Sequence, residues 1–148
     1  MTTQEVLNLN KSVLETWNAH DTKKFLSFCD ESVVWIDTGI PDPFRGKEEA
    51  GNFFNMWTKA FPDLKIKLVN AIANETSIAC EIEFSGTNTG ALVMPGQPEI
   101  AATNRTVSNK GSYFANVRNG KVIEVRSYPD RVGMMTQLGL MQEQHAHA

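Results

Sequence analysis

Two aspartates stand where a carboxylate could carry out proton-transfer chemistry. Asp37 ends the β-rich segment VVWID, on the same side as Trp35, and Asp130 follows Pro129 after the last predicted strand. A carboxylate in an apolar pocket can act as a general acid or base near neutral pH. For both aspartates the alternative is a structural role, in a turn or as a helix cap. Asp130 can cap the helix predicted after it. Strand alternation turns Asp130 away from the predicted pocket face unless Pro129 introduces a bulge or bend.

The sequence lacks the short motifs of common cofactor-, metal- and nucleophile-dependent enzymes. It contains no GxGxxG, GxxxxGK, HExxH, GxSxG or CxxC pattern. His20 is the one internal histidine and lies at a predicted helix end. His145 and His147 lie in the C-terminal tail, for which two interpretations are open: weak metal binding or no fixed structure. We therefore expect a site without cofactor or metal, in which carboxylates act beside an apolar pocket.

The hairpin signal Asn119-Gly120 predicts which residues face that pocket. A two-residue turn pairs residue 118 with 121, which sets 116 opposite 123 and 114 opposite 125. The more apolar of the two faces is assigned to the pocket, and it carries Ser112, Phe114, Asn116, Ile123 and Val125. A buried Asn116 needs a hydrogen-bond partner, so it is a candidate substrate contact.

Large aromatic residues are candidates for the pocket walls. They are Trp35, Trp57, Phe61 and Phe114. Ordinary core packing explains such residues equally well. The loop over 87–103, which carries apolar residues among Gly and Pro, is a candidate lid over the pocket or a dimer contact.

Hydrophobic periodicity places helices first and strands second. Helical spacing is predicted from residue 3 to about 17, over 21–28 and over about 47–60, with a further helix within 131–140. Alternating patterns predict strands over 33–37, 64–68, 78–84, 107–118 and 121–128. This order is typical of an α+β fold with helices on one face of an antiparallel sheet, and we expect one domain over 1–148. A curved sheet covered in this way leaves a cavity, which is the default ligand site.

Composition narrows the classes of partner. The 148 residues are 41% hydrophobic and 21% charged, with a formal net charge of −3. This balance argues against nucleic acids and anionic membranes, which both reward a basic face. No apolar run approaches the ~20 residues that span a bilayer, and the start shows no signal pattern, so a cytoplasmic location is expected. Cys29 and Cys80 are then expected to be reduced thiols.

Several segments together resemble a known family. They are WNAHD, FRGKEEAGNFFNMWTKAFPDLK, FSGTNTG, VRNGKVIEVRSYPD and QLG, in order along nearly the whole chain. The sequence is similar to the SnoaL-like polyketide cyclase (ester cyclase) branch of the nuclear transport factor 2-like superfamily. The resemblance implies a cone-shaped fold, with N-terminal helices on the concave face of a curved, mostly antiparallel sheet. It also implies a homodimer or tetramer formed through that sheet.

The resemblance further implies a reaction. Characterised cyclases of this family close a polyketide ring by intramolecular aldol condensation without cofactor or metal, and their general acid/base matches Asp130. Asn116 and Asn88 stand where the enzymes commonly carry histidine. The pocket would hold the substrate folded, so that ring closure is a proximity effect.

Two other functions remain open within the same superfamily. Ketosteroid isomerases use an aspartate just after the first strand, which matches Asp37, although their tyrosine on the first helix is Val13 here. A non-catalytic protein that binds a small ligand is the third reading. Whether the protein is a cyclase, an isomerase or a binding protein, an apolar pocket would suit a polyketide-like or other hydrophobic carbonyl compound.

Overall fold

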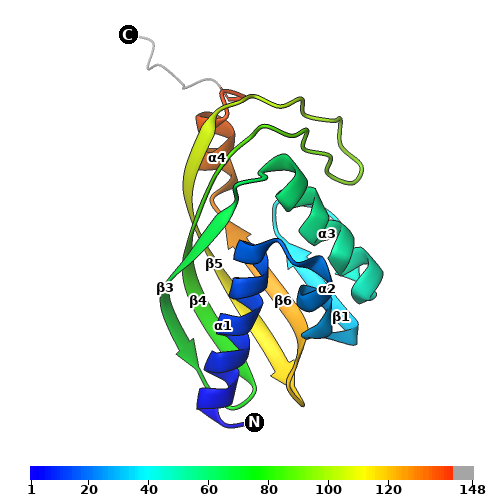
Figure 1. Ribbon diagram of the computed structural model, residues 1–148, viewed down its shortest axis with the longest axis vertical. Coiled ribbons are helices and arrows are strands. Elements are labelled where there is room, and N and C mark those ends of the chain that lie inside the picture. The colour runs from blue at the N-terminus through cyan, green and yellow to red at the C-terminus, as the bar shows by residue number, and fades with distance from the viewer. Residues whose placement is uncertain (142–148) are drawn as a thin grey trace.

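A strongly curved sheet forms the body of the protein (Figure 1). The computed structural model describes residues 1–141, so His145 and His147 lie outside the described residues. Within this range the sheet has six strands in the order β2-β1-β6-β5-β4-β3. Their bounds are β1 Cys29–Asp37, β2 Phe44–Arg45, β3 Lys65–Ala73, β4 Ser77–Thr87, β5 Thr106–Arg118 and β6 Lys121–Pro129. The β1 and β6 strands pair in parallel and the other neighbours are antiparallel.

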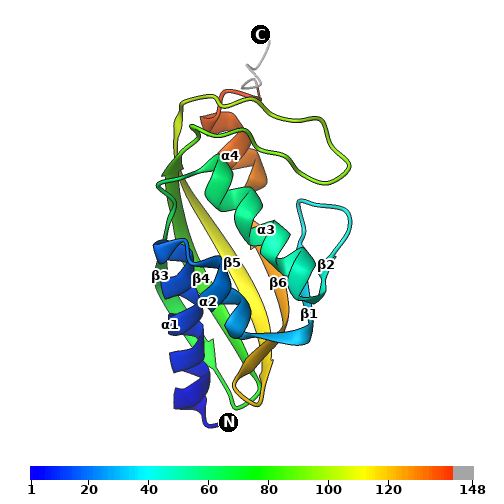
Figure 2. The same cartoon turned by 45° about the vertical axis from the view of Figure 1, so that its right-hand side comes forward.

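The helices gather over one face of this sheet. They are α1 Thr3–Ala19, α2 Thr22–Ser27, α3 Gly46–Ala60 and α4 Arg131–Gln137. Figure 2 shows α1, α2 and α3 in front of the strands, with α4 at the end where β6 stops. The predicted α+β class, with helices on the concave face of a mostly antiparallel sheet, is confirmed.

Local signals set the helix ends. The side chain of Thr2 accepts a hydrogen bond from the Glu5 backbone, and the Glu5 side chain accepts one from the Thr2 backbone, so a capping box starts α1. Asp21 caps α2, accepting from the Lys24 backbone at 3.0 Å. Each of these caps accepts hydrogen bonds from backbone N–H groups that the first helical turn leaves without partners.

The hairpin between β5 and β6 contains a bulge that the sequence pattern did not reveal. Val117 pairs with Val122, but Asn116 pairs with Glu124, so that Ile123 is an extra residue in β6. The bulge keeps Val125 on the concave face and moves its partner from Phe114 to Ala115. The predicted pocket face of β5 is therefore wrong, and its odd-numbered residues face inward.

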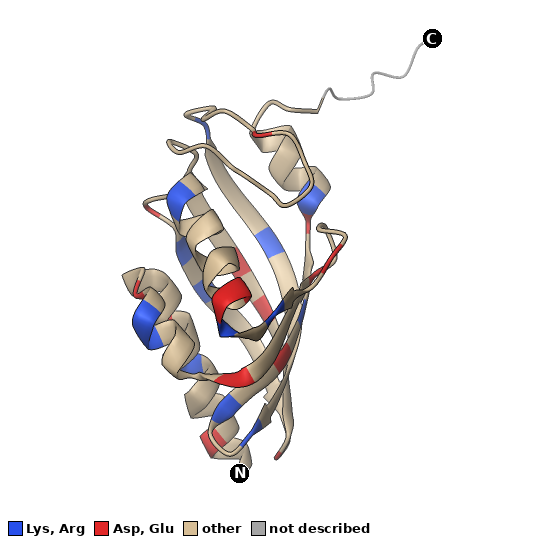
Figure 3. Cartoon of the chain, turned by 90° about the vertical axis from the view of Figure 1, so that its right-hand side faces the viewer, with Lys and Arg blue, Asp and Glu red and all other residues tan. Residues whose placement is uncertain are grey.

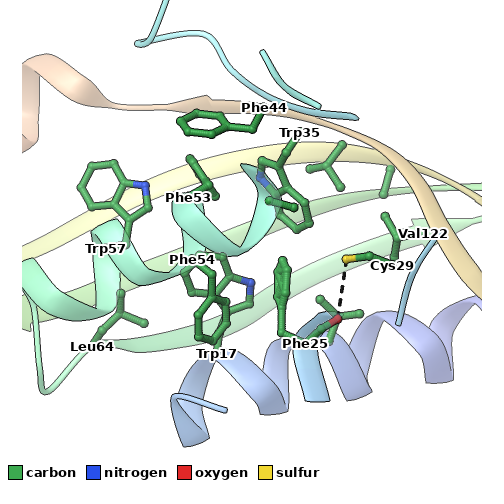
Figure 4. Packing of buried hydrophobic residues seen from close by; sticks show 14 of the residues in the cluster. Trp17, Phe25, Cys29, Trp35, Phe44, Phe53, Phe54, Trp57, Leu64 and Val122 are labelled. Carbon is green, nitrogen blue, oxygen red and sulfur yellow. Dashed lines mark hydrogen bonds between the residues drawn. The ribbon is translucent and has the colours of Figure 1, made fainter. Parts of the chain in front are cut away.

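Aromatic side chains form the densest part of the core (Figure 4). Trp17 of α1 stands 4.3 Å from Phe54 of α3, and Phe25 of α2 lies 4.6 Å from the same ring, measured between ring centroids. Trp35 reaches this cluster from β1, with its centroid 5.2 Å from that of Phe25. These contacts fix three helices to one end of the sheet, and one side of the cluster forms part of the wall of the site described below.

Charged residues are distributed over the exterior. In Figure 3 the positions of basic and acidic residues are interspersed along both helices and strands. No helix within residues 1–141 combines the length and apolar character that crossing a membrane requires.

Candidate functional site

A cavity of about 140 Å³ lies between the helices and the concave face of the sheet. Most of its walls are apolar, and they come from α1, α3 and five of the strands. The apolar lining includes Leu9, Val13, Leu14, Trp17, Trp35, Phe53, Trp57, Ile66, Ile78, Ile82, Phe84, Ala115, Val117, Val122 and Val125. The helical spacing of α1 and the strand alternation of β4 to β6 direct these side chains inward.

A buried ion pair lies at the wall of this cavity. The Nη2 atom of Arg131 is 2.7 Å from Oδ1 and 2.6 Å from Oδ2 of Asp37. The Asp37 side chain is only 4% exposed and that of Arg131 is 18% exposed. Asp37 is the last residue of β1 and Arg131 the first residue of α4, so parallel pairing of β1 with β6 brings their positions together. The pair thus forms a charged point in an otherwise apolar wall.

The surroundings hold both partners in place. The backbone N–H of Gly39 donates to Asp37 Oδ1 at 2.8 Å. The guanidinium carbon of Arg131 lies 4.8 Å from the centre of the Trp57 ring, a cation–π contact. Gly39 leaves room for this arrangement, because a Cβ atom added there would stand 2.6 Å from Arg131 Nε. Arg131 was not among the predicted site residues, and its position directly after Asp130 was the only available signal.

The position predicted for Asp130 is wrong. The residue is exposed and does not line the cavity. Its side chain accepts a hydrogen bond from the Gly133 backbone at 2.9 Å, so it caps α4, and its carbonyl accepts one from Asn109 Nδ2 at 2.8 Å. The β6 strand stays in register to Pro129, which pairs with Gly111. Because no bulge occurs at Pro129, nothing turns the Asp130 carboxylate inward.

Asn116 and Phe114 lie on the outer face of the sheet, contrary to the prediction. Asn116 Oδ1 accepts a hydrogen bond from Arg126 Nη1 at 2.8 Å. Phe114 is 45% exposed and packs edge-on against Tyr128, with 6.0 Å between ring centroids. The bulge at Ile123 explains both corrections, since it reverses which β5 residues share a face with Val125.

The remaining predicted site residues divide into two groups. Trp35, Trp57 and Val125 line the cavity, as Asp37 does. Phe61 is fully buried behind the wall, with its ring centroid 5.1 Å from that of Phe84. Asn88 is fully buried and ties its own loop to Ala60, Gly90 and Thr103 by hydrogen bonds. Residues 87–103 contribute none of the residues that line the cavity, and their role as a lid or a dimer contact stays a prediction.

Further polar residues of the cavity escaped the sequence reasoning. Asn10 on α1, Tyr113 on β5 and Ser127 on β6 all line the cavity. Burial raises the pKa of the Tyr113 hydroxyl far above its ordinary value, so the group stays protonated. Asn10 was hidden in the apolar stripe of α1, and the face of Tyr113 could be assigned only after the bulge was known. Among residues 1–141 no cluster of three or more His, Cys, Asp or Glu side chains could hold a metal ion.

The chain resembles a described family and several solved structures. Residues 8–138 match the model of the family described as SnoaL-like polyketide cyclase. AclR from Streptomyces galilaeus superimposes with a TM-score of 0.80 at 19% identity, covering 98% of this chain and 91% of its own. A SnoaL-like protein from Jannaschia sp. CCS1 gives 0.79 at 20% identity and covers 95% of each chain.

A more distant neighbour has a ketosteroid isomerase-like fold. It comes from Catenulispora acidiphila, and it superimposes with a TM-score of 0.73 at 12% identity, covering 95% of this chain and 96% of its own. The comparison with curated proteins found no match. At these identities the solved structures establish the shared fold, while the family match covers nearly the whole chain.

Proposed function

This chain belongs to the SnoaL-like polyketide cyclase family, and we propose that it is a cofactor-free acid–base enzyme for a small hydrophobic carbonyl compound. The observation that carries the proposal is the Asp37 carboxylate, buried at the wall of an apolar cavity and paired with Arg131. Asp37 takes the role of proton-transferring group that the family resemblance had implied for Asp130.

The proposed reaction begins with proton abstraction from a carbon next to a carbonyl group. An Asp37 carboxylate oxygen takes the proton, and the electron pair of the C–H bond moves into the carbonyl to form an enolate. In an isomerisation the protonated Asp37 returns the proton to another carbon. In an aldol cyclisation the enolate carbon attacks a second carbonyl carbon, and the alkoxide formed takes the proton back. Neither route requires an external oxidant or reductant.

The other cavity residues support these steps. The positive charge of Arg131 stabilises negative charge close to Asp37, and a water-poor site strengthens that interaction. The apolar walls exclude water and hold a flexible substrate in a folded conformation, which lowers the entropy cost of ring closure. A cavity of about 140 Å³ suits a compound with at least one ring, since one of ~150 Å³ accommodates benzene.

Deuterium exchange tests the proposal without knowledge of the natural substrate. The purified protein is incubated with 2-tetralone in D₂O, and NMR measures deuterium incorporation beside the carbonyl. We expect the wild type to accelerate exchange and Asp37→Asn to lose about 100-fold or more of that acceleration. Asp130→Asn is the matched control, because it removes the exposed cap carboxylate, and it should keep the wild-type rate. An Asp37→Asn variant as fast as the wild type would refute the proposal.

One observation favours a non-catalytic ligand-binding protein as the second candidate. Both oxygens of Asp37 accept hydrogen bonds from Arg131, and Oδ1 also accepts one from Gly39. These three donors occupy three of the roughly four lone-pair positions of the carboxylate and leave one for a substrate proton. A binding protein would bind 2-tetralone without accelerating exchange. It would lose that binding in Ala115→Trp, because the new side chain fills the cavity.

We also propose that two copies of the chain associate through the outer face of the sheet. Phe114, Tyr128 and Ile72 are 45%, 47% and 71% exposed, and in-register pairing places all three on this face. Exposed apolar groups gathered on one sheet face are typical of a protein–protein contact.

A further inference from the structure

Asn10 interrupts the apolar stripe of α1. It lies one helical turn from Val6 and Val13, which are buried, and it is itself only 7% exposed. Asparagine is seldom buried in such a stripe, because its amide must find hydrogen-bond partners. Asn10 is among the residues that line the cavity, so its partner can come from a bound molecule.

Tyr113 provides a hydrogen-bond partner for the oxygen of the Asn10 amide but not for its nitrogen. The Tyr113 hydroxyl donates a hydrogen bond to Asn10 Oδ1. An asparagine amide can also donate two hydrogen bonds through Nδ2. Within residues 1–141, Asn10 Nδ2 is buried and has no hydrogen-bond partner. The tyrosine therefore fixes the orientation of an amide whose donor group meets no protein acceptor among the described residues.

Strand register places this amide across the cavity from the ion pair. Asp37 pairs with Ser127 across β1 and β6, and Ser127 pairs with Tyr113 across β6 and β5. These three residues form one row over the concave face, and each of them lines the cavity. Neighbouring strands are ~4.8 Å apart, so the backbones of Asp37 and Tyr113 are separated by roughly 10 Å. The cavity thus has a polar group at each end, with Ser127 between them and mostly apolar walls elsewhere.

We propose that Asn10 donates a hydrogen bond through Nδ2 to a second oxygen of the substrate, at the end of the cavity away from Asp37. Tyr113 is a positioning residue for that amide. This inference rests on the proposed function and narrows its substrate class to compounds that carry a reacting ketone at one end of a ring system and a hydroxyl or carbonyl oxygen at the other. A site built to hydrogen-bond such an oxygen discriminates against analogues that lack it.

A pair of ligands that differ in one oxygen tests the inference. Isothermal titration calorimetry measures the affinities of 2-tetralone and 6-hydroxy-2-tetralone for each protein. We expect the wild type to bind the hydroxylated compound about tenfold more tightly, the gain typical of one good hydrogen bond. In Asn10→Leu the ratio of the two affinities should fall to about one. Asn8→Leu is the matched control, because Asn8 lies on the exposed side of α1, and it should keep the wild-type ratio.

A second variant distinguishes the loss of the Asn10 hydrogen bond from a folding defect. Asn10→Leu alone leaves the Tyr113 hydroxyl without its acceptor, so the double variant Asn10→Leu/Tyr113→Phe replaces the polar pair with apolar groups of similar size. Its affinity ratio should also be about one. A wild-type ratio near one, or a tenfold ratio that survives in both variants, overturns the inference and leaves the proposed function standing. A wild type that binds neither compound overturns both.

Discussion

Arg131 Nη2 contacts both carboxylate oxygens of Asp37, at 2.7 and 2.6 Å, although the two residues are 94 positions apart in the sequence. A side chain from the start of α4 thereby closes the end of the cavity against the last residue of β1. The same contact supplies the positive charge of the candidate site, so stability and function depend on it together.

Removing Arg131 should destabilise the fold. Arg131→Met leaves the buried Asp37 carboxylate without its cation, and we expect a loss of about 3 kcal/mol in the free energy of unfolding, measured by urea denaturation. Lys47→Met is the control, because the Lys47–Glu31 pair spans 3.1 Å with Glu31 88% exposed, and it should cost less than ~1 kcal/mol. In the double variant Arg131→Met/Asp37→Asn much of the stability should return. A double variant no more stable than Arg131→Met would contradict the assigned interaction.

The hydrogen bonds of Asn88 should stabilise the folded state. Its Nδ2 donates to the carbonyls of Ala60 and Gly90, at 3.2 and 2.8 Å, and its Oδ1 accepts from Thr103 N and Oγ1, at 3.0 and 2.9 Å. Asn88→Ala removes the partners of the part-buried Gly90 carbonyl and Thr103 N–H, so we expect a loss of about 2 kcal/mol in thermal or urea unfolding. Hydrogen exchange should also show faster exchange of the Thr103 amide. Unchanged exchange there would show that the hydrogen bond does not hold the loop.

Asp63 should make the stability depend on pH in the acid range. The Thr87 backbone N–H donates to Asp63 Oδ1 at 2.7 Å and holds the pKa of Asp63 below its ordinary value of 3.8. A carboxylate whose pKa is lower in the folded state stabilises the fold above its unfolded pKa, and this contribution disappears as pH falls through the folded value. Urea unfolding should therefore find Asp63→Asn less stable than the wild type at pH 6. The difference should shrink below about pH 4. A difference that stays constant from pH 6 to pH 2.5 would exclude this ionic contribution.

The outer face of the sheet should control association. Phe114→Lys introduces a charge at the exposed aromatic pair of Phe114 and Tyr128, and sedimentation velocity should then show monomers where the wild type forms dimers. Val132→Lys is the matched control, since Val132 is 63% exposed on α4, and it should leave the dimer intact. Equal dimer fractions in wild type and Phe114→Lys would place the interface elsewhere.

Much of the architecture was predictable from local patterns. The helical spacing of α1 and α3, the alternation in β4 and the Asn-Gly hairpin all correspond to observed elements. The family resemblance is confirmed by the match over residues 8–138. The short strand β2 was missed, because two residues within a Pro- and Gly-bearing loop carry no periodicity.

The candidate site was predictable only in part. Asp37 was singled out from its place at the end of a strand, and the structure puts it in the cavity wall. Asp130 also stood at a strand end, but its carboxylate caps α4 because β6 continues in register up to Pro129. Strand alternation had already placed Asp37 on the side of Trp35 and turned Asp130 away, so only a bulge at Pro129 could have brought Asp130 inward.

The sequence by itself determined most of the elements and the family, because each of these depends on residues a few positions apart or on motifs in a fixed order. Tertiary structure alone decided which side chains enter the cavity. One extra residue at Ile123 reverses the face of β5, and the pairing of Arg131 with Asp37 requires parallel strands far apart in the chain. Strand register and long-range contacts arise from the packing of the whole sheet, and no local pattern encodes them.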